Sequence, residues 1–538
     1  MAAAFAKLNA DEEAALRAAD DWAGADVWRW LAPRAQQEQK RCPNECWGRG
    51  RCLYGFCHCE ASFWGVDCGL SAARAARLAA RRAAVRPRIF VYELPAALRR
   101  SCASWRLPED LGDHVLASDH LEPDAARADL FWVYGCPNVE TVLPALAWVK
   151  RAHPHWAAAV AEGRARHVLT VPHEEGWAEV WRYLALWVED RARPNVDHSN
   201  GDGSWDDLHP ASATRQLAAL QLSGYSDYVA RGARDPIRRV SATAPCYICF
   251  QPGKDVVVPA FPGLVDYPNH RGFSGPGAQY QASSRGAPDE CAALARHGAW
   301  HDGKPAKRSR RPRLFFSGAV ITKGHGPELY EASRVPLYRC WKNASRDLGF
   351  QIVQTEHVDV SVYPWEVERG VDANAVSRQA SVCVVPEGKS GGYGHRATTA
   401  AMLGCVPLFT KERFSFPVFH EEIDWATLSL HVPPAELPRL PQLLEAADVE
   451  AKRARLGGVR RRLLWASIYS DCRLAPGEGG AADAFDTLMA TLRRPRVHFR
   501  RGAEHRAPRA PELLPRLDAW MRALPGAEQC AWPERRRG

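Results

Sequence analysis

Residues 377–409 read SRQASVCVVPEGKSGGYGHRATTAAMLGCVPLF, and the fold class can be inferred from this stretch. The apolar run SVCVVP is typical of a buried strand. A glycine-rich loop follows it, then a helix-like segment, HRATTAAML, and a second apolar strand, GCVPLF. Strand, loop, helix and strand in this order predict a parallel βαβ unit, the repeating unit of an α/β protein.

The loop and helix start of this unit predict a site for an anion. Glycines such as Gly392 and Gly394 let backbone amides approach a ligand closely, and the start of a helix favours negative charge. A nucleotide-sugar diphosphate is the natural ligand, and Arg396 is placed to pair with it through its planar guanidinium. Lys389 on the loop is a weaker candidate. The alternative is a structural turn with a solvent-facing Arg396.

Similar strands occur in two blocks, on either side of a Pro/Gly/Ser-rich passage (262–288) and a basic run, KPAKRSRRPR. The first block contains RIFVYELP, ADLFWVYG, HVLTVPH and DVVVPAF, and the second contains LFFSGAV, FQIVQ, SVCVVP and GCVPLF. Strands that alternate with helical stretches in two blocks predict two doubly wound parallel sheets. A length of 538 residues also exceeds what one hydrophobic core supports.

A cysteine-rich island, residues 42–70, precedes these blocks. Its six cysteines have the order C-x3-C-x5-C-x4-C-x-C-x8-C. So short a module buries too little apolar area to fold alone, so disulfides must restrict its unfolded state. Spacing alone leaves fifteen connectivities open. Zinc bound by Cys57-His58-Cys59 is the alternative, although the paired C-x2–4-C knuckles of zinc ribbons are missing.

The island resembles EGF-like modules, which share its GxG turn and the pair Trp64-Gly65 before the last cysteine. That resemblance implies the three disulfides Cys42–Cys52, Cys46–Cys57 and Cys59–Cys68.

The α/β region, about 88–465, resembles the exostosin-like family of inverting glycosyltransferases. The matching segments, in order, are RIFVYELP, ADLFWVYG, HVLTVPHEEG, PGKDVVVPAF with DYPNH, RPRLFFSGA, the long stretch 377–409, and FPVFHEEIDWATLSLHVPPAELPRLPQLL. The resemblance implies two Rossmann-like domains that face a cleft (a GT-B-like fold). It implies that the nucleotide-sugar donor binds in the C-terminal half and the polysaccharide or glycoprotein glycan acceptor toward the N-terminal half. It also implies catalysis without a metal or other cofactor.

Many members of the family carry a glutamate three residues after the motif arginine, a position where nucleotide-sugar enzymes commonly hold the donor ribose. Here that position is Thr399, which hydrogen-bonds but cannot hold two hydroxyls as a carboxylate does. A non-catalytic glycan-binding or adhesion protein with the same fold is therefore the alternative to an active enzyme.

Inverting transfer needs a base that takes the proton of the acceptor hydroxyl. The first candidates are His173, Glu174 and Glu175, since they follow an apolar strand and ligands bind at the carboxyl ends of strands in open α/β sheets. Asp255 in PGKDVVVP is the next candidate, with the fixing of a loop as its alternative role.

The disulfide module and the glycosylation sequon at Asn343 predict the Golgi or another secretory lumen. No apolar run approaches the ~20 residues that span a bilayer, and the first forty residues contain no signal peptide, so we expect a membrane anchor upstream of Met1.

The net charge of +9 lies largely in Arg-rich stretches. Nucleic-acid binding through the basic run KPAKRSRRPR is a weak alternative, because it conflicts with a secretory compartment.

Cys246 and Cys249 could suggest a zinc site. They lack a matching second pair of cysteines, however, which favours a buried thiol or a disulfide over zinc.

The expected organisation is a lead (1–41), the EGF-like module (42–70), an Ala/Arg helical connector (71–87), an N-terminal acceptor domain (88–300), a C-terminal donor domain (312–490) and a basic Pro-rich tail (491–538).

Overall fold

The fold is given by a computed structural model of the chain. The described residues are 42–53, 56–94, 107–135, 145–171, 217–221, 250–259, 312–320, 333–354, 371–386, 396–410, 416–469 and 482–496, without positions 147, 150, 151, 163, 343, 344, 372 and 464.

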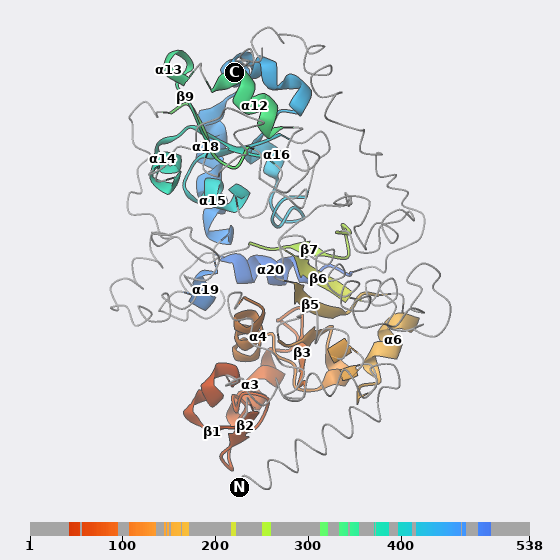
Figure 1. The fold of residues 1–538 in the computed structure, drawn as a ribbon. Helices are drawn as coiled ribbons and strands as arrows, with labels where there is room; N and C mark the ends of the chain where they lie inside the picture. Colours follow the sequence, from red (N-terminus) through yellow and green to blue (C-terminus); the bar gives the residue numbers. More distant parts are fainter. Residues whose placement is uncertain are drawn as a thin grey trace, which may run out of the picture.

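Two five-stranded parallel sheets organise the chain, which confirms the predicted α/β class (Figure 1). The first sheet has the order β3-β4-β5-β6-β7, with β3 (Ile89–Tyr92), β4 (Leu130–Val133), β5 (His167–Val171), β6 (Leu217–Gln221) and β7 (Val256–Val257). The second has the order β12-β11-β10-β8-β9, with β8 (Leu314–Gly318), β9 (Phe350–Gln354), β10 (Val382–Val385), β11 (Val406–Phe409) and β12 (Leu430–His431).

The strands are continuous apolar runs because a parallel sheet is covered on both faces. Every residue of β4 (LFWV), β10 (VCVV) and β11 (VPLF) is buried. The second sheet is doubly wound as predicted: β9 lies on one side of β8, and the chain then crosses to place β10 on the other side. The described strands of the first sheet instead follow chain order without a reversal. The topological switch point that the described strands contain therefore lies between β8 and β10.

Helices pack around both sheets (Figure 1). With the first sheet lie α4 (Leu107–Ala117) and α6 (His155–Ala161). With the second lie α12 (Arg334–Trp341), α13 (Ser345–Leu348), α14 (Ala373–Gln379), α15 (Arg396–Met402), α16 (Trp425–Leu428), α17 (Leu440–Ala446) and α18 (Val449–Val459). The chain then continues through α19 (Ala466–Tyr469) to α20 (Ala484–Leu492).

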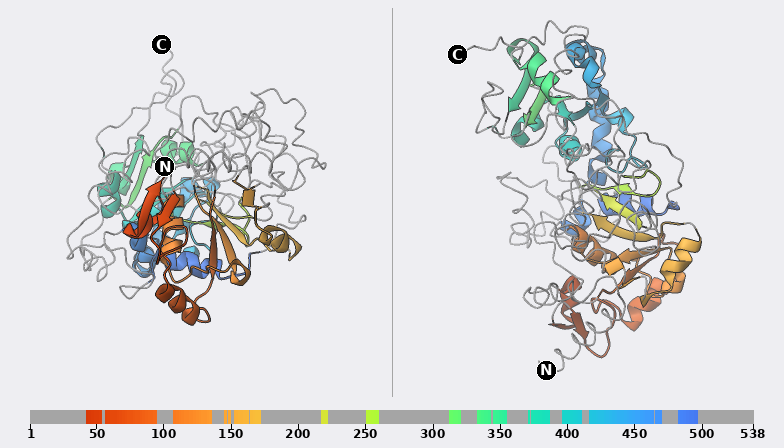
Figure 2. Two further views of the ribbon diagram at one scale, coloured as in Figure 1. Left: turned by 90° about the horizontal axis from the view of Figure 1, so that it is seen from below. Right: turned by 45° about the vertical axis from the view of Figure 1, so that its right-hand side comes forward.

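Helix α20 returns to the first sheet and lies between the two sheets (Figures 1 and 2). Its start is fixed by a capping box, in which Asp483 accepts from the amide of Asp486 and the Asp486 side chain accepts from the amide of Asp483. Its Phe485 ring packs edge-on against His114 of α4, with 4.4 Å between ring centres. Past the helix, Arg496 is buried, and its carbonyl accepts from the amide of Ala165 just before β5. Helix α20 and the contact of Arg496 therefore extend past residue 490, where the donor domain was expected to end.

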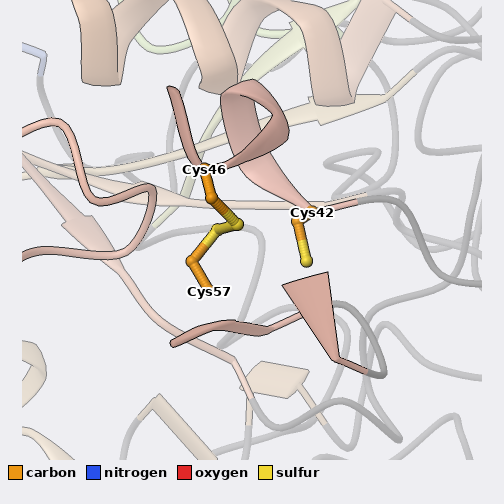
Figure 3. A group of neighbouring side chains, drawn as sticks. All are labelled: Cys42, Cys46 and Cys57. Carbon is orange, nitrogen blue, oxygen red and sulfur yellow. A yellow bond between two sulfur atoms is a disulfide. The ribbon is translucent and has the colours of Figure 1, made fainter. Parts of the chain in front are cut away.

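The cysteine-rich island folds as predicted around three disulfides, Cys42–Cys52, Cys46–Cys57 and Cys59–Cys68. It contains a short 3-10 segment, Pro43–Gly48, and a hairpin of β1 (Gly50–Leu53) and β2 (Phe56–Cys59). Three sulfur atoms lie close together, as a metal site would require, but Figure 3 shows that Cys46 and Cys57 are joined to each other, and Cys42 is bonded to Cys52. Cys57 and Cys59, the two cysteines of the zinc alternative, are bonded to Cys46 and Cys68, which contradicts that alternative.

The predicted helical connector is α3 (Ala72–Arg81). It packs against the first α/β unit, by which we mean the first sheet with its helices α4 and α6. Arg74 donates to the carbonyl oxygen of Leu116 at 2.5 Å, and Leu78 is buried. Arg77 and Arg81 both pair with Asp119. Part of the basic charge of the connector is therefore balanced by acids of the first unit and does not form a free cationic surface.

The cysteine-rich island is also attached directly to that unit. Asn44 donates through Nδ2 to Asp67 at 2.7 Å within the island and to the carbonyl oxygen of Asp113 in α4 at 2.9 Å.

Among the described residues, no helix is both long and apolar enough to cross a bilayer.

Candidate functional site

The predicted anion-binding arginine lies at the switch point of the second sheet. Arg396 is the first residue of α15, which follows β10 in the chain, and β10 is the neighbour of β8. Its Nη1 atom donates to the carbonyl oxygen of Ser317 at 2.5 Å, near the carboxyl end of β8. Its guanidinium carbon lies 5.9 Å from the ring centre of Phe316, one residue earlier. In open α/β sheets, ligands bind in the crevice outside the strand carboxyl ends at such a reversal of strand order.

Two buried hydroxyls lie on elements that meet the same edge of this sheet. Thr398 is in the first turn of α15, and Thr410 directly follows the carboxyl end of β11. Both side chains are buried, and neither Oγ1 has a hydrogen-bond partner within the described part of the chain. Orphaned buried polar groups are rare in folded proteins, and a missing ligand or water is one reason for them. Thr399, the position where the family resemblance implies a glutamate, is half-buried between Thr398 and the buried Ala400.

Asp255, the alternative base, is used inside the fold. Its carboxylate is fully buried and accepts hydrogen bonds from the amides of Ala219 at 3.1 Å and Gln251 at 2.9 Å. It also pairs with the buried ammonium of Lys254, which donates to the carbonyl oxygen of Leu217 at 2.9 Å. Burial raises the pKa of Asp255 and lowers the pKa of Lys254. These contacts join β6 to the turn before β7, which favours the loop-fixing role over proton transfer from an acceptor.

The remaining predicted site residues lie outside the described part of the chain, and their roles stay predictions: His173, Glu174, Glu175, Lys389, Gly392, Gly394, Asn343, Cys246 and Cys249. Of these, His173 to Glu175 come shortly after the carboxyl end of β5, which is Val171.

A layer of aromatic and histidine side chains packs on one face of the first sheet. The Tyr92 hydroxyl lies 3.0 Å from Nε2 of His167, and the Trp156 and His167 rings have centres 4.4 Å apart. Burial lowers the pKa of His167 to about 3 and raises the pKa of Tyr92. Both groups are therefore neutral near pH 7, and this layer is part of the core.

A cavity of about 570 Å³ lies away from the switch point, between the end of the connector and α20. Its lining includes the ionisable side chains Arg86, His120, Glu422, Asp486, Arg493 and Arg494. Arg86 pairs with Asp129 at 2.7 Å, and Arg494 pairs with Glu422 at 2.8 Å. Two of the three arginines that line the cavity therefore have acidic partners.

No family model matches the chain, and no curated protein matches it. Among solved structures, it is similar to the glycotransferase of kitacinnamycin, at 16% identity over 72% of this chain and 81% of that one, with a TM-score of 0.28. It is also similar to a spinosyn rhamnosyltransferase complexed with spinosyn aglycone (12% identity, 72% and 98% covered, TM-score 0.27). A third similar structure is described as a UDP-N-acetylglucosamine 2-epimerase from Listeria monocytogenes (8% identity, 71% and 92% covered, TM-score 0.27). Similarity at this level identifies neither a family nor an activity, so the function has to be inferred from the residues of the chain.

Proposed function

We propose that this chain is an inverting glycosyltransferase of the exostosin-like family, which moves a sugar from a nucleotide-sugar donor to a glycan acceptor. The observation that supports this most directly is the position of the Arg396 guanidinium, at the switch point of the second sheet. Residues 377–409, the motif that resembles the family, include α15 and β10, and β10 is one of the two strands that flank the switch point. The proposal thus combines an independent topological argument with the sequence resemblance.

The proposed role of Arg396 is to bind the donor diphosphate. In the transfer, the bond between the sugar C1 and the diphosphate oxygen breaks while the acceptor oxygen bonds to C1. Negative charge grows on the leaving diphosphate, and a planar guanidinium binds it through charge-assisted hydrogen bonds. Lys389 and the backbone at Gly392 and Gly394 complete the proposed cradle, and Thr399 takes the place next to the ribose. No metal or other cofactor is part of this proposal.

The acceptor is proposed to approach from the first sheet. As its hydroxyl oxygen attacks C1, the hydroxyl proton moves to a base among His173, Glu174 and Glu175. In the sequence they follow β5 shortly after its last residue, and ligands of open α/β sheets bind at the carboxyl ends of strands, which supports this role.

The proposed location is the lumen of the Golgi apparatus or secretory pathway, in association with the membrane. Disulfides support the compartment: besides the three in the island, Cys383 is bonded to Cys405, and the described cysteines include no free thiol. Such bonds form and persist in oxidising compartments.

A non-catalytic glycan-binding protein is the second candidate, and Thr399 is the observation that favours it. Thr399 would hold the donor ribose more weakly than a carboxylate does. The second candidate would therefore bind a glycan without turning over a donor. Donor turnover by the purified chain distinguishes the two.

The test of the main proposal is Arg396→Ala. Removal of a donor that stabilises developing charge costs about 10²–10³ in rate, so most transfer should be lost while the fold persists. Arg396→Lys should restore activity only in part, because a point charge does not reproduce the planar fork. Arg439→Ala is a matched control, since that arginine is exposed and pairs with Glu436 on the surface of the same unit. Near-normal turnover in Arg396→Ala would place the donor elsewhere and refute the proposed site.

A further inference from the structure

Gly318, the last residue of β8, faces the guanidinium of Arg396. A methyl carbon added to Gly318 would lie 2.6 Å from Nη2 of Arg396 and 3.3 Å from both Cζ and Nη1. A carbon atom does not approach a heavy atom to which it is not bonded as closely as 2.6 Å. Any residue other than glycine at position 318 therefore requires either its own backbone or the Arg396 guanidinium to move. The guanidinium is the far end of a flexible side chain and would move before the backbone does.

Three consecutive residues of β8 thus lie against the guanidinium. The Phe316 ring faces it at 5.9 Å, the Ser317 carbonyl oxygen accepts its Nη1 hydrogen at 2.5 Å, and Gly318 leaves the space into which Nη2 fits. The backbone of Gly318 has φ +159°, at the limit of the range that side-chain-bearing residues rarely adopt. A glycine is therefore favoured here both by the backbone and by the neighbouring side chain.

We propose that Gly318 is a positioning residue for the donor: by remaining without a side chain, it lets Arg396 cross the carboxyl edge of β8 and present its guanidinium to a nucleoside diphosphate. This inference rests on the proposed function and adds a specific role for a residue outside the glycine-rich loop. Gly318 acts through Arg396 and does not itself contact the reacting atoms.

The test is Gly318→Ala, with UDP and GDP as the probes and calorimetric Kd values as the readout. The nucleotide that binds the unaltered chain more tightly is used for all variants. We expect at least tenfold weaker binding in Gly318→Ala, because the displaced guanidinium no longer meets the diphosphate. If the unaltered chain binds neither nucleotide at millimolar concentration, both the inference and the proposed donor site are overturned.

Gly349→Ala is the matched control for the backbone effect. Gly349 directly precedes β9, at the amino end of that strand, whereas Gly318 lies at the carboxyl end of the neighbouring β8. The φ of Gly349 is +68°. Among the residues that the structure describes, an added methyl carbon there would meet only Arg313, at an ordinary 3.6 Å from its Cβ. This variant should lose stability through its backbone conformation yet keep the Kd of the unaltered chain. A tenfold loss of affinity in Gly349→Ala as well would show that unfolding, and not the position of Arg396, weakens binding.

A double-mutant comparison separates positioning from a direct role. If Gly318 acts through Arg396, Gly318→Ala should change the Kd less than twofold when Arg396 is already alanine. An equal loss in both backgrounds would overturn the inference. If Arg396→Ala weakens binding but Gly318→Ala does not, the positioning role fails and the donor site stands. If Arg396→Ala binds normally, the donor site itself is wrong.

Discussion

Cys383 in β10 and Cys405 immediately before β11 are joined by a disulfide between neighbouring parallel strands. The two cysteines are 22 positions apart and both are buried. Between them lie the whole glycine-rich loop, residues 387–395, and helix α15 with Arg396. The segment proposed to bind the donor is therefore closed at both ends by one covalent bond in the core of the sheet.

Replacement of both Cys383 and Cys405 by alanine should lower the free energy of unfolding by about 3 kcal/mol, the loss expected from the loop entropy of a link of this length. Urea unfolding of the purified variant measures it. Donor affinity should fall as well, since the ends of the binding segment are no longer tied together.

The matched control is the pair Cys59→Ala and Cys68→Ala, which removes a disulfide of the cysteine-rich island. That variant should lose stability but keep the donor Kd of the unaltered chain. An unchanged stability in Cys383→Ala/Cys405→Ala would show that the bond does not constrain the unfolded chain.

Asp255→Asn should destabilise the chain strongly while leaving transfer per folded molecule close to normal. The substitution leaves the buried ammonium of Lys254 without its counter-charge, and loss of one partner of a buried ion pair costs about 3–5 kcal/mol. Thermal unfolding and donor turnover, measured on the same sample, check both parts. A variant of full stability without turnover would make Asp255 the base. The double variant Lys254→Met/Asp255→Asn should recover part of the lost stability.

Strand patterns in the sequence predicted most of both sheets, because buried parallel strands are continuous apolar runs. Two strands were not predicted. β6 reads LAALQ, whose alanines and leucines favour helices, and it is a strand only because it lies between β5 and β7 in a fully buried position. β12 has only two residues, Leu430 and His431, and pairs with the end of β11. Tertiary contacts, which no local pattern contains, determine both.

The site was predicted only as far as one continuous motif reaches. Arg396 follows from the order of strand, glycine-rich loop and helix within residues 377–409. Its contacts with Ser317 and Gly318 depend on β10 lying beside β8, and strand order in a sheet is not visible along the chain. A glycine at the end of an apolar strand was the one available signal. The same limit applies to Asp255, whose two possible roles were equal until its burial was known.

Arg496→Met should destabilise the chain although the residue lies in a stretch that the sequence predicts to be a tail. Its guanidinium binds Glu421 through two hydrogen bonds, of 2.6 and 3.0 Å, and its side chain is only 1% exposed. Loss of this largely buried partner should cost about 3 kcal/mol. Arg494→Met is the control, since Arg494 pairs with Glu422 while 54% exposed and should change stability by less than about 0.5 kcal/mol. Equal melting temperatures for the two variants would contradict a structural role for Arg496.

Stability should fall as the pH is lowered from about 6.5 toward 3, because burial depresses the pKa of two core histidines, His114 and His167, to about 3 each. In the unfolded chain these groups titrate near pH 6.5, so between the two values the unfolded state binds more protons and gains stability relative to the fold. Each histidine contributes a slope of up to about 1.4 kcal/mol per pH unit in this window and none above it. His114→Leu should remove the contribution of His114, because leucine fills the space against Phe485 without titrating. Urea midpoints at pH 5, 6 and 7.5 measure the slope, with His58→Gln on the exposed surface of the island as the control. A slope in His114→Leu as steep as that of the unaltered chain would show that His114 does not stay neutral in the fold.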